Sequence, residues 1–245
     1  MLFLRSLAFN VAFIAWTAIV TIGCLPALLL PRGATFAVSR FWARGVLGLL
    51  AVLVGLRHEV RGADRLPNGP VIYAVKHQSA WETIAFALLI PRFAGVFKRE
   101  LLRIPIYGWY LWRAAMIPID RGAGAGALRK MLRKARATAA EGRSIVVMPE
   151  GTRVAPGGRR YYHSGIAALY LDLGLPVVPV ALNSGYFWGR RAFIKQPGTI
   201  VFALLEPIAP GLDRKEFMVL LKQRIEDAAE ALAQEARAQL GKSGP

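Results

Sequence analysis

Cysteine and histidine are scarce in this chain, and their scarcity excludes several kinds of site. The single cysteine, Cys24, excludes an intrachain disulfide and a metal site built from cysteine ligands. The three histidines, His58, His77 and His163, include no pair at the spacing that metal ligands show. We therefore expect the protein to hold no metal.

Glycine-rich cofactor motifs are missing as well. The run Gly122-Ala-Gly-Ala-Gly126 is rich in glycine, but it lacks the Gly-Lys-Ser/Thr ending of a phosphate-binding P-loop. It also lacks the glycine spacing of a dinucleotide-binding turn. We interpret this run as a flexible connection, and we expect no cofactor.

Acidic side chains are few relative to basic ones. The 245 residues contain 15 Asp and Glu against 32 Lys and Arg, which gives a formal net charge of +17. Such a balance favours an anionic partner, namely nucleic acid, an anionic membrane surface or a phosphorylated substrate. Because the sequence contains no groove-reading or base-stacking module, we expect no nucleic acid among the partners.

Hydrophobic residues make up 55% of the chain. Near the N-terminus, the run from Leu7 to Leu30 contains no charged side chain. As a helix, this run is long enough to cross a hydrocarbon core of about 30 Å. A secretory signal is the alternative, because Arg5 precedes the apolar run. The run is long for the apolar part of a signal and lacks a clear Ala-x-Ala site, so we favour an uncleaved membrane anchor.

A second apolar segment, Ala34 to Leu56, carries Arg40 and Arg44 one helical turn apart. This spacing puts both guanidinium groups on one helix face, where they can reach phosphate headgroups. Pro31-Arg-Gly33 supplies a turn between the segments, so residues 1–56 are predicted to form a helical hairpin in or on the bilayer. The arginines that follow the first segment place the rest of the chain on the cytoplasmic side. A full span and a re-entrant hairpin both remain open.

Residues 57–245 have the composition of a globular domain, in which short β-branched and aromatic runs alternate with helical stretches. The predicted strands are Val71–Val75, Ala94–Phe97, Met116–Ile119, Ile145–Met148, Val177–Leu182 and Thr199–Leu204. The predicted helices are Trp81–Leu89, Ile106–Arg113, Ala127–Glu141, Ile166–Leu173 and Leu212–Leu240. This alternation predicts an α/β fold with a mixed, mostly parallel sheet flanked by helices.

His77 and Glu82 lie in the run Val75-Lys-His-Gln-Ser-Ala-Trp-Glu-Thr83, between a predicted strand and a predicted helix. Turns that follow strands are common places for reactive groups in α/β folds. An imidazole can take a proton near neutral pH, and a nearby carboxylate can fix its tautomer. A structural alternative stays open here, because Ser79 followed by Glu82 is also the pattern of a helix capping box.

Two arginines follow other predicted strands. Arg121 comes directly after Asp120 at the end of one strand, and Arg153 comes shortly after Glu150 at the end of another. Two guanidinium groups could clamp a phosphate dianion through bidentate hydrogen bonds. The alternative is that each arginine pairs with the acid beside it.

Four blocks occur in order along the chain: His77 to Glu82, Ala115-Met-Ile-Pro-Ile-Asp-Arg121, Met148-Pro-Glu-Gly-Thr-Arg153 and Val178-Pro-Val180. They are similar to His-x-x-x-x-Asp, Gly-x-Ile-Phe-Ile-Asp-Arg, Phe-Pro-Glu-Gly-Thr-Arg and Val-Pro-Val of the glycerolipid acyltransferase family. The chain thus resembles bacterial 1-acylglycerol-3-phosphate O-acyltransferases from about Leu66 to Pro207, and its hairpin also looks like theirs. This resemblance implies a glycerol-3-phosphate acyltransferase-like fold.

By this resemblance, the protein would transfer a fatty acyl chain from acyl-CoA or acyl carrier protein to the free hydroxyl of 1-acylglycerol-3-phosphate, forming phosphatidic acid. His77 would be the general base, and Glu82 would orient its imidazole. The substrate phosphate would be held by Arg121, Arg153, Lys98 and Arg99. Substrate positioning would fall to Glu150, Gly151 and Thr152. The protein would work on membrane lipids at the cytoplasmic face of a bacterial inner membrane.

Two departures from the family pattern concern the site. Glu82 stands where the family usually has aspartate, which adds one methylene between the carboxylate and the backbone. His163 and Ser164 stand where relatives often have Lys-Pro before a glycine.

Two other functions remain open, an acyltransferase for another lysolipid such as lyso-ornithine lipid and a non-catalytic basic membrane adaptor. Acyl-chain preference, the acyl carrier and the oligomeric state are not predicted.

Overall fold

A seven-stranded sheet is the central element of the computed structural model, which describes residues 1–120, 122 and 124–241. The strand order is β1-β7-β6-β2-β5-β3-β4. Every neighbouring pair is parallel except β6 and β7, which run antiparallel. The predicted mixed, mostly parallel sheet is therefore confirmed. The strands are β1 (Leu56–Arg61), β2 (Ile72–Val75), β3 (Ala94–Lys98), β4 (Ile117–Ile119), β5 (Ile145–Val147), β6 (Val177–Leu182) and β7 (Gly198–Leu204).

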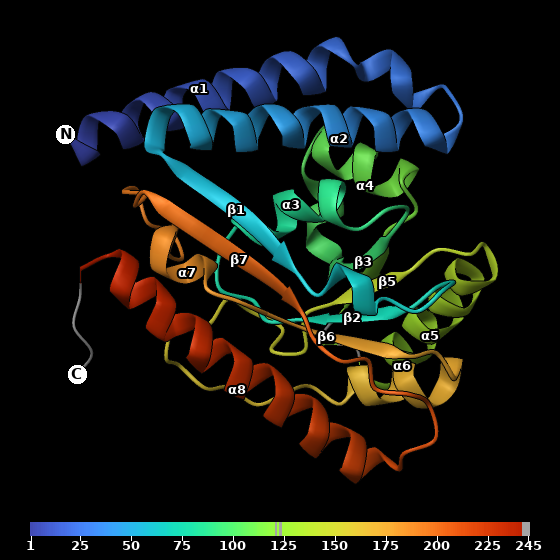
Figure 1. The fold of residues 1–245 in the computed structure, drawn as a ribbon. Helices are drawn as coiled ribbons and strands as arrows, with labels where there is room; N and C mark the ends of the chain where they lie inside the picture. The colour runs from blue at the N-terminus through green and yellow to red at the C-terminus, as the bar shows by residue number, and fades with distance from the viewer. Residues whose placement is uncertain (121, 123, 242–245) are drawn as a thin grey trace.

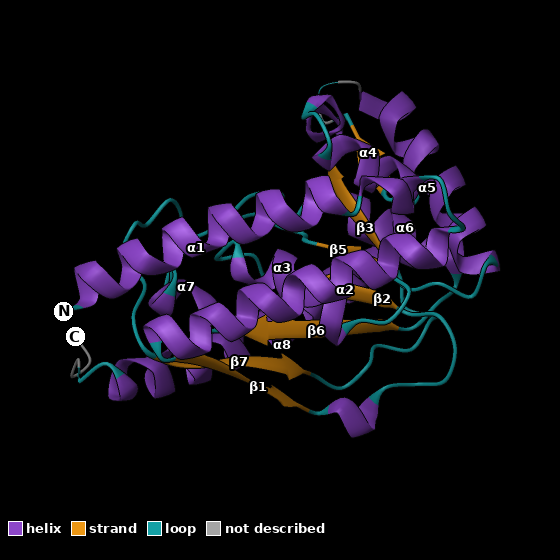
Figure 2. Ribbon diagram, turned by 90° about the horizontal axis from the view of Figure 1, so that it is seen from above, coloured by secondary structure: helices purple, strands orange, loops and turns teal. Residues whose placement is uncertain are grey.

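Helices cover both faces of this sheet (Figure 1). The two N-terminal helices lie across one face together with α3, whereas α5, α6 and α8 lie on the other (Figures 1 and 2). The helices are α1 (Leu2–Gly23), α2 (Arg32–Leu49), α3 (Trp81–Leu89), α4 (Tyr107–Arg113), α5 (Gly124–Ala140), α6 (Gly165–Leu173), α7 (Ser184–Phe187) and α8 (Arg214–Gln239). The last helix begins with a capping box between Asp213 and Glu216, close to its predicted start.

Successive residues of a strand point to opposite faces of a sheet, so the strands contribute side chains to apolar clusters on both faces. In β2, Tyr73 and Val75 pack in the cluster that contains Phe9 of the N-terminal helix. Ile72 and Ala74, on the opposite face, pack in the cluster formed with α5, α6 and the first half of α8. All four are buried, so β2 packs against helices on both of its faces.

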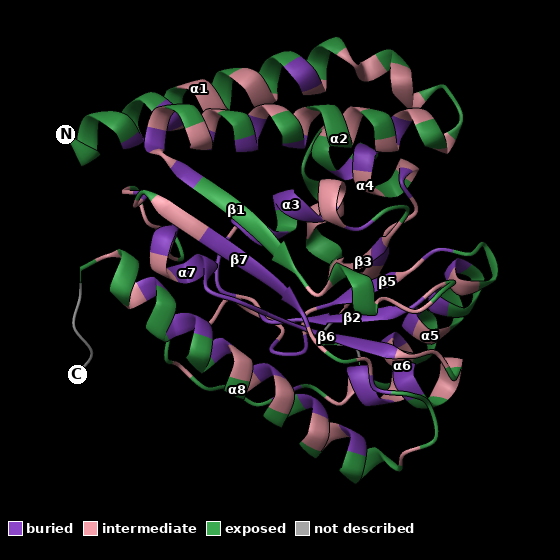
Figure 3. Ribbon diagram, in the orientation of Figure 1, coloured by how far each residue is buried: buried purple, intermediate pink, exposed green. Residues whose placement is uncertain are grey.

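The N-terminal helices form an antiparallel pair with many exposed residues (Figure 3), and the exposed residues include the apolar Val11, Ile14 and Phe41. Both helices are long and apolar enough to cross a membrane. Arg40 and Arg44 are exposed on α2, as their spacing predicted. The turn is not at Pro31-Arg-Gly33, because α2 begins at Arg32, directly after Pro31. Pro31 occupies the cap position, where its missing N–H removes no helical hydrogen bond, and the connection lies before it.

The junction between the hairpin and the sheet is tight. A π-helical turn at Leu50–Val54 extends α2 and ends at Gly55, whose φ of 81° is left-handed and favours glycine. Strand β1 begins at the next residue, Leu56. Phe9 and Leu50 of the hairpin also belong to the same apolar cluster as residues of β2 and β6. The two predicted domains therefore share one core.

Two local interpretations of the sequence were wrong. Strand β1 went unrecognised, because it is an edge strand that exposes every residue after Leu56 and so shows no alternation. The run Gly122–Gly126 is not simply a connection, because α5 already begins at Gly124. Glycine suits the first position of this helix because Gly124 has a φ of 52°, a left-handed conformation that favours glycine.

Candidate active site

The candidate site lies at the edge of the sheet where parallel strands end. His77 follows β2, Arg153 follows β5, and Lys98 is the last residue of β3. Because β2, β5 and β3 are parallel neighbours, their carboxyl ends meet at one edge. A cavity of about 890 Å³ opens at this edge, and it is lined by all three of these side chains.

His77 and Glu82 form the direct contact that their spacing predicted. His77 Nδ1 lies 2.9 Å from Glu82 Oε1, and the imidazole lines the cavity while the carboxylate is fully buried. In the tautomer in which Nδ1 carries the proton and donates to Glu82, Nε2 is left with a lone pair. The arrangement therefore provides an oriented imidazole that can accept a proton.

The Glu82 carboxylate also binds the backbone of the turn between β2 and α3. Its Oε1 accepts the backbone N–H groups of Gln78 at 2.7 Å and Ser79 at 2.8 Å, and its Oε2 accepts the Ser184 hydroxyl at 2.9 Å. Only half of the predicted capping box is present, because Ser79 Oγ accepts from Trp81 instead and α3 begins after Ala80. One oxygen thus both caps the turn and contacts the imidazole, so the two roles are not alternatives.

Glu150 lies beneath the site and does not line the cavity. Its fully buried carboxylate accepts the backbone N–H of His77 at 2.8 Å and a hydrogen bond from Lys76 Nζ at 3.1 Å. Burial raises the pKa of the Glu150 carboxyl, whereas Lys76 and the His77 N–H act in the opposite direction. The residue therefore fixes the backbone of the His77 turn.

Lys76 connects this turn to the last helix. Its ammonium donates to both carboxylate oxygens of Glu226 on α8, at 2.8 and 2.9 Å, and the Tyr162 hydroxyl donates to the same carboxylate at 2.9 Å. Buried charges are costly unless they are paired and hydrogen-bonded, as these are. The network joins β2, the turn after β5 and α8 directly under His77.

The residues predicted to hold a phosphate are only partly brought together. Gly151, Thr152, Arg153 and Lys98 all line the cavity with His77. Arg153 does not pair with Glu150, which is taken by Lys76, and its guanidinium has no ion-pair partner among the residues that the structure describes. The alternative that it merely neutralises its neighbour is therefore wrong.

The remaining predicted phosphate ligands are placed differently. Lys98 is exposed and lies 3.3 Å from Glu100, so its ammonium is shared with a surface acid. Arg99 does not line the cavity, and its guanidinium lies 3.5 Å from Asp120. Arg121 lies outside the described residues.

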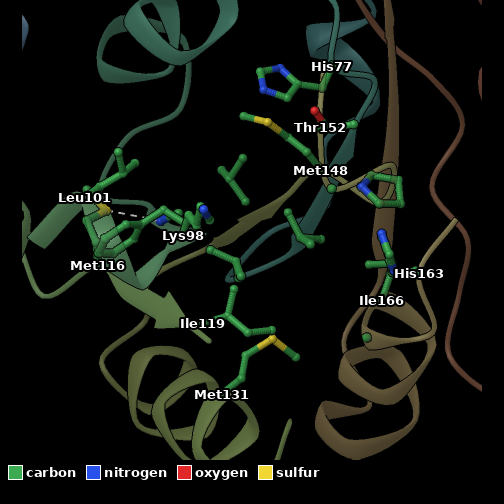
Figure 4. A pocket seen from close by; sticks show the side chains of 18 of the residues that line it. His77, Lys98, Leu101, Met116, Ile119, Met131, Met148, Thr152, His163 and Ile166 are labelled. Carbon is green, nitrogen blue, oxygen red and sulfur yellow. Dashed lines mark hydrogen bonds between the residues drawn. The ribbon is translucent and has the colours of Figure 1, made fainter. Parts of the chain in front are cut away.

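The cavity changes character along its length (Figure 4). His77, Thr152 and Met148 lie at one end, and Ile119 and Met131 lie at the other. Between these ends, Met116 and Ile166 line the cavity together with Lys98 and His163. Such a lining fits a ligand with a polar reacting end and a long apolar remainder. In the described part of the chain, no cluster of acidic, histidine or cysteine side chains could hold a metal ion.

Several residues of the site could not be found by sequence reasoning. Ser184 contacts Glu82 from more than a hundred residues away, and Arg190 and Arg191 line the cavity from the loop that follows α7. Lys76 is next to His77 in sequence, but its partner Glu226 lies on the last helix. Each of these contacts depends on the order of the strands, which spacing along the chain does not reveal.

Comparisons with known proteins agree with this architecture. A family model described as Acyltransferase matches residues 57–183. The 1-acyl-sn-glycerol-3-phosphate acyltransferase of Pseudomonas aeruginosa is 36% identical over 181 residues, which is 74% of this chain and 70% of the relative. The lyso-ornithine lipid O-acyltransferase of the same organism is 26% identical over 206 residues, covering 77% of this chain and 76% of the relative.

A solved structure shares the fold. The crystal structure of the 1-acyl-sn-glycerophosphate (LPA) acyltransferase from Thermotoga maritima superimposes with a TM-score of 0.75 at 21% identity. The match covers 94% of this chain and 95% of that chain, so it includes the N-terminal hairpin as well as the sheet.

Proposed function

This chain belongs to the acyltransferase family, and we propose that it transfers a fatty acyl chain to the free hydroxyl of 1-acylglycerol-3-phosphate, forming phosphatidic acid. The family predicted from the four sequence blocks is thereby confirmed. The acceptor is supported by relatives in Pseudomonas aeruginosa and Limnanthes alba that carry this activity in their names, at 36% and 29% identity. The acyl donor is a thioester of coenzyme A or of acyl carrier protein.

The observation that carries the proposal is the contact between His77 and Glu82 in a cavity that also holds Arg153. His77 Nε2 takes the proton of the acceptor hydroxyl while the oxygen of that hydroxyl forms a bond to the thioester carbonyl carbon. The carbon–sulfur bond then breaks, and the proton returns from the imidazolium to the departing thiolate. Glu82 holds the imidazole and stabilises its charged form, as the acid of a catalytic triad does.

The acceptor phosphate is bound by Arg153, because this guanidinium lines the cavity and is not neutralised by Glu150. Lys98 and Thr152 line the same cavity and assist it. Arg121 completes the proposed set, whereas Arg99 is left out of it because it does not line the cavity and lies against Asp120. Holding the phosphate at a fixed distance from His77 places the hydroxyl within reach of the base. Glu150 acts indirectly, through the backbone of the His77 turn.

The hairpin holds the site at a bilayer. Its two apolar helices associate with the membrane, from which lipid substrates can enter the cavity without crossing water. We place the protein at the inner membrane of a bacterium with the catalytic domain on the cytoplasmic face. This orientation is supported by the arginines that follow the first helix.

The test is an acceptor panel with the purified protein in mixed micelles. We expect phosphatidic acid from 1-acylglycerol-3-phosphate with acyl-CoA or acyl carrier protein as donor, and far slower acylation of a monoacylglycerol, which lacks the phosphate. Equal rates with both acceptors would contradict the role of Arg153. No acyl transfer with either donor would contradict the proposed reaction and favour a non-catalytic adaptor.

Lyso-ornithine lipid is a second candidate acceptor, to be tested in the same panel. Lyso-ornithine lipid is supported by the 26% identical relative from Pseudomonas aeruginosa, which is similar over 77% of this chain. It offers a carboxylate and an ammonium where the first acceptor offers a phosphate. Preference for lyso-ornithine lipid would move the assignment to that acceptor while leaving His77 and Glu82 in the same roles.

A further inference from the structure

Two neighbouring arginines line the cavity, and neither has a role in the proposed reaction. Arg190 and Arg191 follow α7, and both are exposed at the cavity. Neither side chain has a hydrogen-bond or ion-pair partner among the described residues. Arg191 also has a φ of 58°, an unusual backbone conformation for a residue with a side chain. Two unpaired guanidinium groups at one place form a ready site for an anion.

The arginines follow a different strand from the proposed acceptor ligands. In the sheet, β2 lies between β6 and β5. Arg153 follows β5 and Lys98 ends β3, whereas Arg190 and Arg191 come after β6. Because β6 is parallel to β2, its carboxyl end is at the same edge as the His77 turn. The cavity therefore takes basic side chains from segments that follow strands on both sides of β2.

The beginning of the arginine segment is fixed to the His77 turn. The Ser184 hydroxyl donates to Glu82, and the backbone N–H of Gly185 donates to the Gln78 side chain at 3.1 Å. A side chain at Gly185 would come within 2.9 Å of Pro156, so only glycine allows this approach. Helix α7 is thus held directly against the catalytic turn.

The end of the segment is fixed to the hairpin. The backbone N–H of Gln196 donates to the Phe187 carbonyl at 2.8 Å, which closes the loop. Lys195 is buried, its ammonium donates to Asn10 of α1 at 2.6 Å, and it lies over the rings of Phe9 and Trp188 at 5.4 and 5.1 Å. The backbone that carries Arg190 and Arg191 is therefore held at both ends while their side chains stay unpaired.

We propose that Arg190 and Arg191 form a second anion subsite, which binds the phosphate at the end of the pantetheine arm of the acyl donor. This inference rests on the proposed function, in which two phosphorylated substrates react at one imidazole. Arg153 binds the acceptor phosphate, so Arg190 and Arg191 are left for the phosphate of the donor. Coenzyme A and acyl carrier protein both carry a pantetheine phosphate, so the subsite serves either donor.

The test compares the double variant R190A/R191A with the wild type and with R159A/R160A. The control removes two adjacent exposed arginines that do not line the cavity. We expect the KM for acyl-CoA to rise about 10- to 100-fold in R190A/R191A, the range for losing one or two charge-assisted hydrogen bonds, with the acceptor KM and kcat within about 2-fold. The control should match the wild type. Because neither arginine has a partner, the melting temperature should not change.

Two further donors identify what the arginines bind. The variant should show a raised KM with acyl carrier protein as well, but wild-type kinetics with an S-acyl pantetheine that lacks the phosphate. If the KM rises with acyl-CoA but not with acyl carrier protein, the arginines bind the nucleotide part of coenzyme A, and the assignment to the pantetheine phosphate is wrong. An unchanged donor KM with a raised acceptor KM, or with weaker binding to anionic vesicles, would overturn the proposal in favour of the acceptor or the lipid surface.

Equilibrium binding of free coenzyme A separates this inference from the proposed function, because it requires no turnover. The wild type should bind coenzyme A at least about 10-fold more tightly than R190A/R191A. If the wild type forms no phosphatidic acid but shows this difference, the reaction is wrong and the subsite stands. Equal affinity for the two proteins would refute the subsite even where the reaction is confirmed.

Discussion

The hairpin and the sheet domain place their apolar side chains in opposite ways. In α1, Val11, Ile14 and Ile19 are 60%, 67% and 66% exposed, whereas every residue of β2 and β6 is buried. The same helix nevertheless sends Phe9, which is fully buried, into the core of the sheet. The difference shows that α1 has two apolar faces with different environments, one against the core and one available to lipid.

The two regions also treat polar groups differently. In the hairpin, the two tryptophan N–H groups use neutral acceptors: Trp16 Nε1 donates to the Trp42 carbonyl at 3.0 Å, and Trp42 Nε1 donates to the Thr17 hydroxyl at 3.1 Å. In the sheet domain, charged side chains are buried as the network of Lys76, Glu150 and Glu226. Burying charged side chains costs free energy, so a buried ionic network indicates a structural or functional role for the residues that it contacts. Here it supports the backbone of the His77 turn.

The largest expected effect concerns the lipid-facing side of α1. The triple variant V11D/I14D/I19D should lose membrane binding, because each acidic side chain costs about 2.5–3.5 kcal/mol at the centre of a membrane helix. Vesicle flotation measures the loss. V219D, which changes an exposed apolar residue of α8, should still float with the vesicles. Unchanged flotation of the triple variant would contradict a lipid-facing hairpin.

The core-facing side of the same helix gives the complementary prediction. F9A should destabilise the folded protein by about 3–5 kcal/mol, because it removes a fully buried ring from the shared core. V11A, two residues further on but exposed, should cost far less. Thermal unfolding in detergent compares them. Equal melting temperatures for F9A and V11A would show that the hairpin is not part of the core.

A smaller effect is expected where a single polar contact supports the site. S184A should destabilise the protein by about 1–3 kcal/mol and lower kcat, because buried Glu82 Oε2 loses its hydroxyl donor. S184T keeps a hydroxyl and should recover part of the activity. Vesicle flotation should be the same for both variants. Full activity in S184A would mean that Glu82 does not need this donor.

The last of these predictions concerns the contact between the two regions, where burial lowers the pKa of Lys195 from 10.5 to about 8. Between these values the unfolded chain binds more protons than the folded one, so stability should rise with pH from about 8 to 10.5 and stay level below. The difference in unfolding free energy between wild type and K195M isolates this residue. A difference that falls over this window would contradict the lowered pKa.

Much of the fold was predictable because its main elements have strong local patterns. The buried strands β2 and β6 have continuous apolar runs, and the helix predicted at Leu212–Leu240 lies within two residues of the bounds of α8. Strand β1 was missed because an exposed edge strand has no such pattern. Helix α7 has only four residues, too few for a helical period to be visible.

The site was predictable only in its local parts. The contact between His77 and Glu82 is set by one turn of chain, and Arg153 lies close to a strand end, so both followed from spacing. The positions of Glu226, Ser184 and Arg190 relative to the imidazole depend on how distant strands are ordered. Sequence spacing contains no measure of that order, which explains why these residues appeared only with the structure.

The most direct test of the account is the turnover number of H77A beside that of H163A, with 1-acylglycerol-3-phosphate as acceptor. Both histidines line the cavity, but only His77 faces a carboxylate within the described residues. We predict that H77A loses about 10²–10⁴-fold in kcat, the usual contribution of a general base, while H163A stays within about 10-fold of wild type. Near wild-type turnover in a folded, membrane-bound H77A would contradict the central claim.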